Sequence, residues 1–243
     1  MRIFLAGATG AIGRRLVPLL VGAGYRVTGS TRSAEKAAGL QAAGVTPVIL
    51  DAFDADAVQA AIFDARPDVL IHQLTDLPQQ FDPANIAEAL TRNARIRIEG
   101  TRNLIGAARA TGVRRVITQS IAFAYAPGPE PHRESDPLAP ADGSMRKTME
   151  GVTALEGLTT TTAGIEGFVL RYGHLYGPGT WAATPSGCTH IHVDAAAHAA
   201  FLAVSHGIPG VYNIADDDGS VAIAKARREL GWNPEFRLPA APQ

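Results

Sequence analysis

The chain has 243 residues, 46% of them apolar, which is enough to bury the core of one α/β domain over residues 1–243. A formal net charge of −1 gives no basic field for nucleic acid, and no apolar run reaches the roughly 18 residues that span a bilayer. We therefore expect a small-molecule substrate and neither nucleic-acid nor membrane partners. A single cysteine, Cys188, precludes an internal disulfide and is consistent with a cytoplasmic protein.

The N-terminal sequence predicts a strand, a tight turn and a helix. Apolar residues 2–6 lead into a glycine-rich turn, and apolar residues resume at helical spacing in 14–20. In the turn, Gly7 would allow a sharp reversal, Gly10 the approach of backbone N–H groups to a pyrophosphate, and Gly13 close helix packing. With a second strand at 25–30, this context predicts dinucleotide binding by Gly7, Thr9, Gly10, Ala11, Ile12 and Gly13. Because the turn begins so early, we expect no cleaved signal peptide.

The end of the second predicted strand favours NADP over NAD. An acidic residue there would bind the adenosine ribose of NAD, but Thr31 stands at that position and Arg32 follows it. A hydroxyl and a guanidinium suit a 2′-phosphate, and Arg14 or Arg15 could add a second cation. The alternative is that Arg32 is a solvated surface residue.

Several motifs in sequence order resemble the short-chain dehydrogenase/reductase superfamily, in particular its extended, epimerase/dehydratase-like branch. They are the Gly-x-x-Gly-x-x-Gly turn, residues 93–104, which resemble Asn-x(6)-Gly-Thr-x-Asn-Leu, and residues 167–179, which end in Tyr-Gly-Pro-Gly. The resemblance covers nearly the whole chain. It implies a doubly wound parallel sheet with helices on both faces, that is, an NAD(P)-binding Rossmann fold.

The resemblance also implies cofactor contacts at the ends of later strands. Asp51, after a strand at 46–50, matches an aspartate that approaches the adenine, with Ala52 beside it; a turn or helix-capping role is the alternative for Asp51. A strand at 67–72 leads into a loop that should flank the cofactor. Further contacts are then expected from His72, as a packed hydrogen-bonded residue, and from Gln73, Leu74, Asn93, Tyr172 and Gly173.

The resemblance places a catalytic hydroxyl at Ser120, the end of a strand at 112–120, although Ile121 replaces the second hydroxyl that commonly follows. The Tyr-x-x-x-Lys pair that relays a proton in the family is missing from the sequence. Alignment of a predicted helix at 144–159 puts Thr148 and Val152 at its two positions. Tyr125 or His174 would then supply the proton.

Two intervals that hold long insertions in the family are short here, 180–191 and 216–224, so the substrate lobe at about 177–243 would be a remnant. We expect an open site for a small or flat substrate. Cys188, His190, His192 and His198 follow the spacing of a strand that runs into a helix, and we predict no metal site.

The leading hypothesis is an NADP-dependent oxidoreductase that acts on a small carbonyl or alcohol, with Ser120 polarising the carbonyl. A non-catalytic NADP-binding redox sensor or regulatory protein is an alternative, because the Tyr-x-x-x-Lys pair is missing. A further alternative is an epimerase or dehydratase that uses bound cofactor transiently. Predicted helices at 83–111 and 144–159 could form a homodimer.

Overall fold

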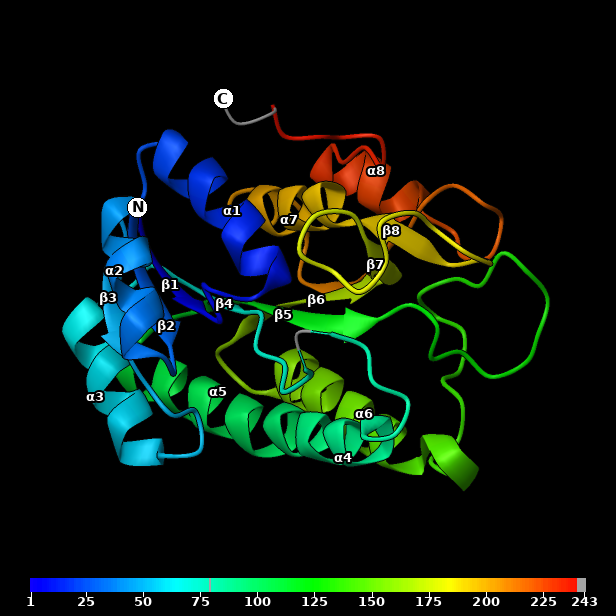
Figure 1. The fold of residues 1–243 in the computed structure, drawn as a ribbon, viewed down its shortest axis with the longest axis horizontal. Coiled ribbons are helices and arrows are strands. Elements are labelled where there is room, and N and C mark those ends of the chain that lie inside the picture. The colour runs from blue at the N-terminus through cyan, green and yellow to red at the C-terminus, as the bar shows by residue number, and fades with distance from the viewer. Residues whose placement is uncertain (79, 240–243) are drawn as a thin grey trace.

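A seven-stranded parallel sheet forms the centre of the structure, a computed structural model that describes residues 1–78 and 80–239 (Figure 1). Its order is β3-β2-β1-β4-β5-β6-β9, and every neighbouring pair is parallel. The strands are β1 Arg2–Ala6, β2 Arg26–Thr31, β3 Thr46–Ile49, β4 Val69–His72, β5 Arg115–Ile121, β6 Glu166–Tyr172 and β9 Gly210–Ile214. The doubly wound parallel sheet is therefore confirmed.

Helices cover both faces of this sheet, which is why its central strands are continuous apolar runs rather than alternating ones. Strand β4, Val-Leu-Ile-His, is buried at all four positions. One face carries α1 Ala11–Gly22, α7 Val193–Leu202 and α8 Ala224–Leu230, and the other carries α3 Ala55–Ala65, α4 Ile86–Arg95, α5 Thr101–Thr111 and α6 Arg146–Thr161 (Figure 1). Helix α2, Ala34–Ala42, packs beside β2 and β3.

The strand order reverses between β1 and β4, and this switch point sets the position of the functional site. The chain winds outward from β1 to β2 and β3, then crosses back to β4, β5 and β6. Ala6 and His72 are the last registered pair of β1 and β4, and the Gln73 N–H donates to the Ala6 carbonyl at 2.9 Å. Loops that diverge from such neighbouring strand ends leave a crevice between them.

Element boundaries differ from the expected ones where backbone geometry intervenes. Gly112 caps α5 with φ +79°, so β5 begins at Arg115 rather than at 112. The segment expected as one helix over 83–111 begins at Ile86 and contains a π-helical turn, Ile96–Gly100. Helix α6 is preceded by a 3₁₀ turn, Gly143–Met145, and extends to Thr161. Helices α4 and α6 pack against each other within one chain, and a homodimer through them stays a prediction.

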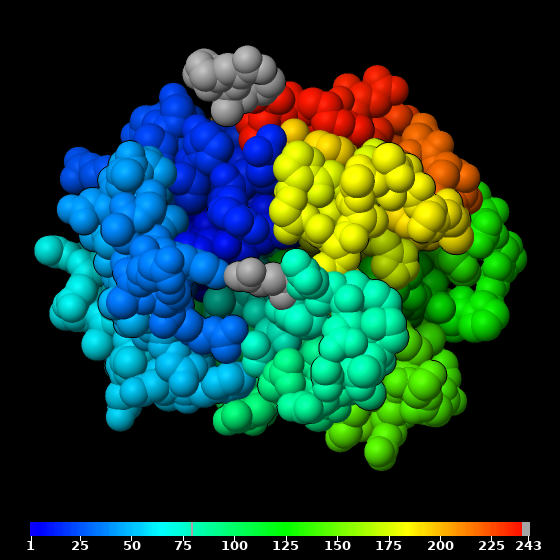
Figure 2. Space-filling model, viewed as in Figure 1, coloured from blue at the N-terminus to red at the C-terminus, as the bar shows by residue number. Residues whose placement is uncertain are grey.

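A second, two-stranded parallel sheet lies near the carboxyl ends of the main strands. It pairs β7, His174–Tyr176, with β8, His190–His192. The loop that joins them, yellow in Figure 2, lies against the cyan segment that follows β4. Within the described residues, no three His, Cys, Asp or Glu side chains are grouped as metal ligands. No helix among those residues combines the length and apolarity of a membrane span.

Close contact between β6 and α6 gives a test of the fold. A Cβ on Gly167, in β6, would collide with the backbone of Thr159, in α6. A Cβ on Gly157, which is also in α6, would meet nothing within 4 Å. Gly167→Ala should lower the free energy of unfolding by about 1–3 kcal/mol, because the added methyl group overpacks this contact. Gly157→Ala should raise it by about 0.5–1 kcal/mol because alanine favours helix. Urea unfolding of both variants measures the difference, and equal effects would contradict the packing described.

Candidate functional site

The glycine turn after β1 has the geometry of a cradle. Gly7 adopts φ +89°, and a Cβ there would lie 2.8 Å from the carbonyl oxygen of Gln73. A Cβ on Gly13 would collide with the Gly7 carbonyl, so only glycine lets α1 start this close to the turn. Gly10, the N-cap of α1, is exposed, and a Cβ there would meet the Gly7 carbonyl oxygen at 3.4 Å. A dinucleotide pyrophosphate fits this turn, since the helix N-terminus and bare backbone face the crevice.

Two cations meet where the adenosine end of a dinucleotide would lie. Thr31 is buried and its hydroxyl lies 3.2 Å from that of Thr9, whereas Arg32 is exposed. Arg32 Nη2 donates to Asp76 Oδ1 at 3.1 Å, and Arg92 Nε lies 3.8 Å from Asp76 Oδ2. A 2′-phosphate could join these guanidinium groups. Sequence reasoning missed Asp76 and Arg92, because neither belongs to a motif.

The other two arginines suggested for the 2′-phosphate lie elsewhere. Arg15 donates to Asp194 Oδ1 at 2.5 Å, and therefore ties α1 to α7. The Arg14 guanidinium lies beside Gly179, in the loop between β7 and β8. A role for either of them at a 2′-phosphate stays a prediction, and Arg92 is the cation that shares Asp76 with Arg32.

Asp51 has the contacts of a turn residue. It is exposed, and its Oδ1 accepts the Phe53 N–H at 3.0 Å. Ala52 is buried, and its carbonyl accepts from Asn103 Nδ2 at 2.9 Å. These contacts fit the turn alternative for Asp51, and the adenine contact stays a prediction.

His72 is a packed, hydrogen-bonded residue at the end of β4, as expected. The Leu74 N–H donates to His72 Nδ1 at 3.1 Å, so the proton is on Nε2, which donates to Thr101 Oγ1 at 3.0 Å. Burial, with a smaller contribution from the positive charge of Arg97, lowers the pKa of His72 to about 3. A neutral His72 therefore shapes the loop that flanks the crevice.

Gln73 and Tyr172, which we expect at the nicotinamide end of the crevice, lie beside each other in the structure. Both are buried, and Gln73 Nε2 donates to the Tyr172 hydroxyl at 3.4 Å. Gln73 Oε1 is buried and has no hydrogen-bond partner among the described residues. A buried acceptor without a donor is costly, so a ligand N–H, such as that of a carboxamide, suits this place. Asn93 Oδ1 holds the same loop by accepting the Asp76 N–H at 3.0 Å.

Gly173 has a packing role beside this end of the crevice. A Cβ on Gly173 would lie 2.6 Å from the Thr189 carbonyl, which approaches from the segment before β8. The close approach explains why glycine follows Tyr172 here.

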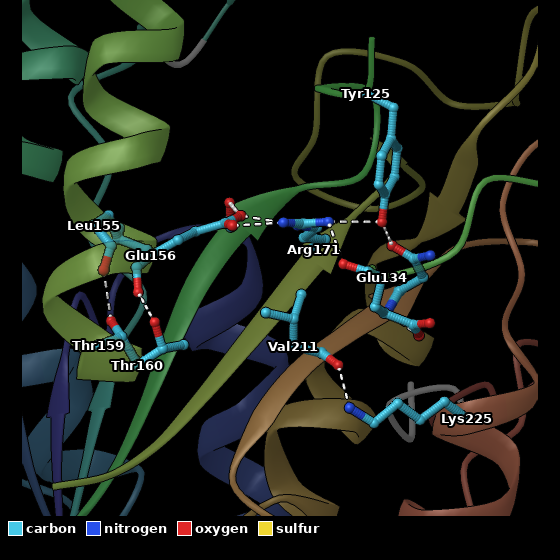
Figure 3. Close-up of polar contacts among 11 residues, drawn as sticks. Tyr125, Glu134, Leu155, Glu156, Thr159, Thr160, Arg171, Val211 and Lys225 are labelled. Carbon is cyan, nitrogen blue, oxygen red and sulfur yellow. Dashed lines mark hydrogen bonds and ion pairs between the residues drawn. The ribbon is translucent and has the colours of Figure 1, made fainter. Parts of the chain in front are cut away.

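A buried ion pair holds Ser120. Glu156, on α6, accepts from Ser120 Oγ at 2.6 Å and from Arg171 Nε and Nη2 at 2.9 and 2.6 Å (Figure 3). Ser120 is 1% exposed. Arg171 Nη1 donates to the Tyr125 hydroxyl at 2.8 Å, and that hydroxyl donates to Asn213 Oδ1 at 2.6 Å. This network joins β5, α6, β6, β9 and the loop after β5.

These contacts bear on the three predicted catalytic residues. The hydroxyl protons of Ser120 and Tyr125 are engaged by Glu156 and Asn213, and burial raises the pKa of Tyr125. His174 is exposed, and burial of part of its ring, with His190 nearby, lowers its pKa. The structure does not gather the three around one substrate atom, and their roles stay predictions. Sequence reasoning missed Glu156, whose only signal was a carboxylate on the apolar face of a predicted helix.

An apolar cluster stands where the family carries its proton-relay groups. Val152, at the expected lysine position, packs with Ile121, at the expected second hydroxyl, together with Met149 and Ala124. Thr148, at the expected tyrosine position, is 5% exposed. Both replacements therefore belong to the interior, and neither position presents an acid or base group.

The low pKa of His72 gives a pH prediction. Between pH 6.5 and about 3 the unfolded chain binds a proton at His72 and the folded chain does not, so acid favours unfolding. As the pH falls through this range, the free energy of unfolding should decrease in the native protein and in His72→Gln. The decrease should be larger in the native protein, by up to about 1.4 kcal/mol per pH unit. Urea unfolding at pH 7 and 4.5 measures this. His206→Gln, which removes an exposed histidine, is the control; identical pH slopes in native protein and His72→Gln would refute the prediction.

The buried ion pair gives a second prediction. Glu156→Gln leaves the Arg171 charge buried without a counterion and should lower the free energy of unfolding by about 3–5 kcal/mol. Glu150, on the same helix, pairs with Lys147 at 3.0 Å on the surface. Glu150→Gln should therefore cost less than about 1 kcal/mol. Thermal or urea unfolding compares the two variants, and similar losses would argue against a structural role for Glu156.

Comparisons with known proteins agree with this geometry. The model of the NAD dependent epimerase/dehydratase family matches residues 3–200. A 3-diazoavenalumate denitrifying reductase from a Streptomyces species is 40% identical over 99% of this chain and 85% of its own length. A putative NADPH-dependent methylglyoxal reductase from Candida albicans is 31% identical over 68% of this chain and 49% of its own.

Solved structures show the same fold. A UDP-glucose 4-epimerase from Thermotoga maritima superposes with a TM-score of 0.77 at 20% identity, covering 98% of this chain and 94% of the other. The family match extends from the glycine cradle through β5, α6, β6 and α7, which together carry the crevice, the Glu156 network and the apolar cluster. The chain therefore belongs to the NAD dependent epimerase/dehydratase family.

Proposed function

We propose that this protein is an NADPH-dependent reductase whose hydride acceptor needs no proton from the enzyme. The apolar cluster of Val152 and Ile121 carries the proposal, since it replaces the groups that would relay a proton. The glycine cradle and the buried Gln73 Oε1, which has no partner among the described residues, support cofactor binding. A cofactor site without a relay pair would favour a reaction that needs only the hydride.

The charge of the acceptor decides whether a proton is needed. When bound, NADPH supplies a hydride. A carbonyl that receives it becomes an alkoxide and requires a proton, whereas a diazonium cation becomes a neutral diazene. The diazene then loses N₂ as its N–H hydrogen moves to carbon, so the reaction balances as R–N₂⁺ plus hydride giving R–H plus N₂. The protein would bind and orient the acceptor, and no side chain would donate a proton.

The relative with 40% identity supports a diazo-type acceptor, because its name describes a denitrifying reductase of a diazo compound. Its match extends over 99% of this chain. We therefore propose a diazo or diazonium compound as the first substrate class.

A small carbonyl compound is the second candidate. The putative methylglyoxal reductase supports it, as does the presence of Ser120 and Tyr125 at one end of the sheet. In that case His174, which is exposed, is our candidate for the proton donor. Its pKa is lowered, so His174 would lose its proton, and carbonyl reduction through it would slow, already as the pH rises toward 6.5.

Turnover separates the candidates. Benzenediazonium and methylglyoxal are each incubated with enzyme and NADPH, and NADPH oxidation and N₂ release are measured against enzyme-free controls. We expect NADPH and N₂ in a one-to-one ratio with benzenediazonium and faster turnover than with methylglyoxal. Preferential reduction of methylglyoxal would support the carbonyl candidate, and binding of NADPH without reduction of either compound would contradict the reductase proposal in favour of a cofactor-binding protein.

Cofactor preference tests the Arg32 and Arg92 site. Loss of one charge-assisted contact to a phosphate weakens binding by about 10-fold or more. Arg32→Ala should therefore lower NADPH affinity by about that factor and leave NADH affinity within about twofold. Arg26→Ala, an exposed arginine at the opposite end of β2, is the matched control. Isothermal titration calorimetry measures the affinity of the native protein and of both variants for NADPH and for NADH. An equal loss of affinity for both cofactors in Arg32→Ala would refute an NADP-specific contact.

A further inference from the structure

Large apolar side chains are exposed around the crevice to an extent that a polar substrate does not explain. Of the described residues, four such side chains lie on segments that follow β4, β5 and β7 or lead into α6: Phe81, Phe123, Met145 and Trp181, which are 55%, 36%, 39% and 42% exposed. Of the four, Phe81 and Trp181 lie together, with ring centroids 5.4 Å apart, and gathered exposed apolar surface often marks a binding site. The carboxyl ends of the strands are also where ligands bind in this architecture.

Phe123 and His174 form a flat wall on this side. Phe123 leaves β5 three residues after Ser120, and His174 opens β7 two residues after Tyr172. Their rings are stacked, with centroids 3.7 Å apart and planes 11° from parallel. One face of the Phe123 ring is covered by His174, and the side chain is still 36% exposed. The wall therefore presents aromatic surface next to the residues that lie at the nicotinamide end of the crevice.

A second aromatic pair borders the same edge. The Trp181 indole N–H donates to the Pro78 carbonyl at 2.9 Å, and the Trp181 and Phe81 rings lie 5.4 Å apart. Tyr176, in the strand that His174 opens, bridges to Ala182, next to Trp181. The hydrogen bond and the bridge fix Trp181 between the loop after β4 and β7. In the space-filling view the yellow loop lies beside the cyan-green segment that follows β4 (Figure 2).

We propose that the substrate carries a planar aromatic ring, which stacks on Phe123 beside His174 and is bordered by Trp181 and Phe81. This inference rests on the proposed function and names the substrate class of the same site. Aromatic rings prefer offset-stacked or edge-to-face contact with other rings, and the two pairs offer both flat and edge surfaces. A sugar would need hydrogen-bonding groups along this wall, and the Phe123 and Phe81 side chains offer none.

Binding of two matched amides tests the ring directly. The protein is saturated with NADP⁺ and titrated with (E)-cinnamamide and with (E)-3-cyclohexylacrylamide, which differ only in the ring, using ligand-detected NMR. We expect cinnamamide to bind about 2- to 10-fold more tightly, because only its ring can stack. Equal affinities would overturn the proposal.

Variants locate the ring. Phe123→Leu should remove most of the preference for cinnamamide, while Phe123→Tyr should retain it because it keeps the ring. Phe63→Leu, which alters an exposed phenylalanine on α3, should change nothing. Retained NADP⁺ affinity shows that each variant is folded. Cinnamamide affinity that is unchanged in Phe123→Leu would contradict the proposal. Self-association of the protein through this edge would also contradict it, because a second copy of the chain would then cover the aromatic side chains.

The binding test of the aromatic site and the turnover test of the reductase can fail independently of each other. Turnover of benzenediazonium together with equal binding of the two amides would overturn the aromatic site and leave the reductase. Preferential binding of cinnamamide without turnover of benzenediazonium or methylglyoxal would overturn the reductase and leave the aromatic site.

Discussion

The buried pair of Glu156 and Arg171 is the constraint on which the site depends. A charge taken out of water is tolerated only with a partner and satisfied hydrogen bonds, and here Ser120, Tyr125 and Asn213 complete the set. The pair fixes α6 against β5 and β6, and therefore also positions the apolar cluster at the start of α6. The same contacts account for the retention of Ser120 and Tyr125 without any requirement that they handle a substrate.

The consequence for chemistry is a division of the crevice into two unlike halves. The cofactor half retains backbone features that only glycine permits and a buried amide oxygen that needs a donor. On the other side, Val152 and Ile121 are buried in an apolar cluster, and the Phe123 and His174 rings are stacked. The buried cluster offers no group for general acid catalysis. Reduction of a cationic acceptor is compatible with both halves.

The fold could be predicted from local signals, because each strand end carries a motif whose backbone role is local: the glycine turn at Gly7, or the end of β4 at His72. Contacts between distant segments could not be predicted in this way. Glu156 accepts hydrogen bonds from Ser120 and Arg171, which are 36 and 15 positions away in the sequence. Asp76 pairs with Arg32 across 44 positions. Such separations form no sequence motif, so these pairs could not be predicted. The sequence showed that Ile121 and Val152 stand where the family pattern has other residues. That these two side chains pack together could be seen only in the structure.

The most direct test of hydride transfer without a proton from the enzyme is a single-turnover measurement of NADPH oxidation with benzenediazonium in H₂O and in D₂O across pH 6 to 8. The account predicts a rate ratio of about 1 and no dependence on pH, because no proton moves in the step that consumes NADPH. A ratio of about 2 or more, together with a rate that falls as one group loses its proton, would show an enzymatic acid and contradict the account.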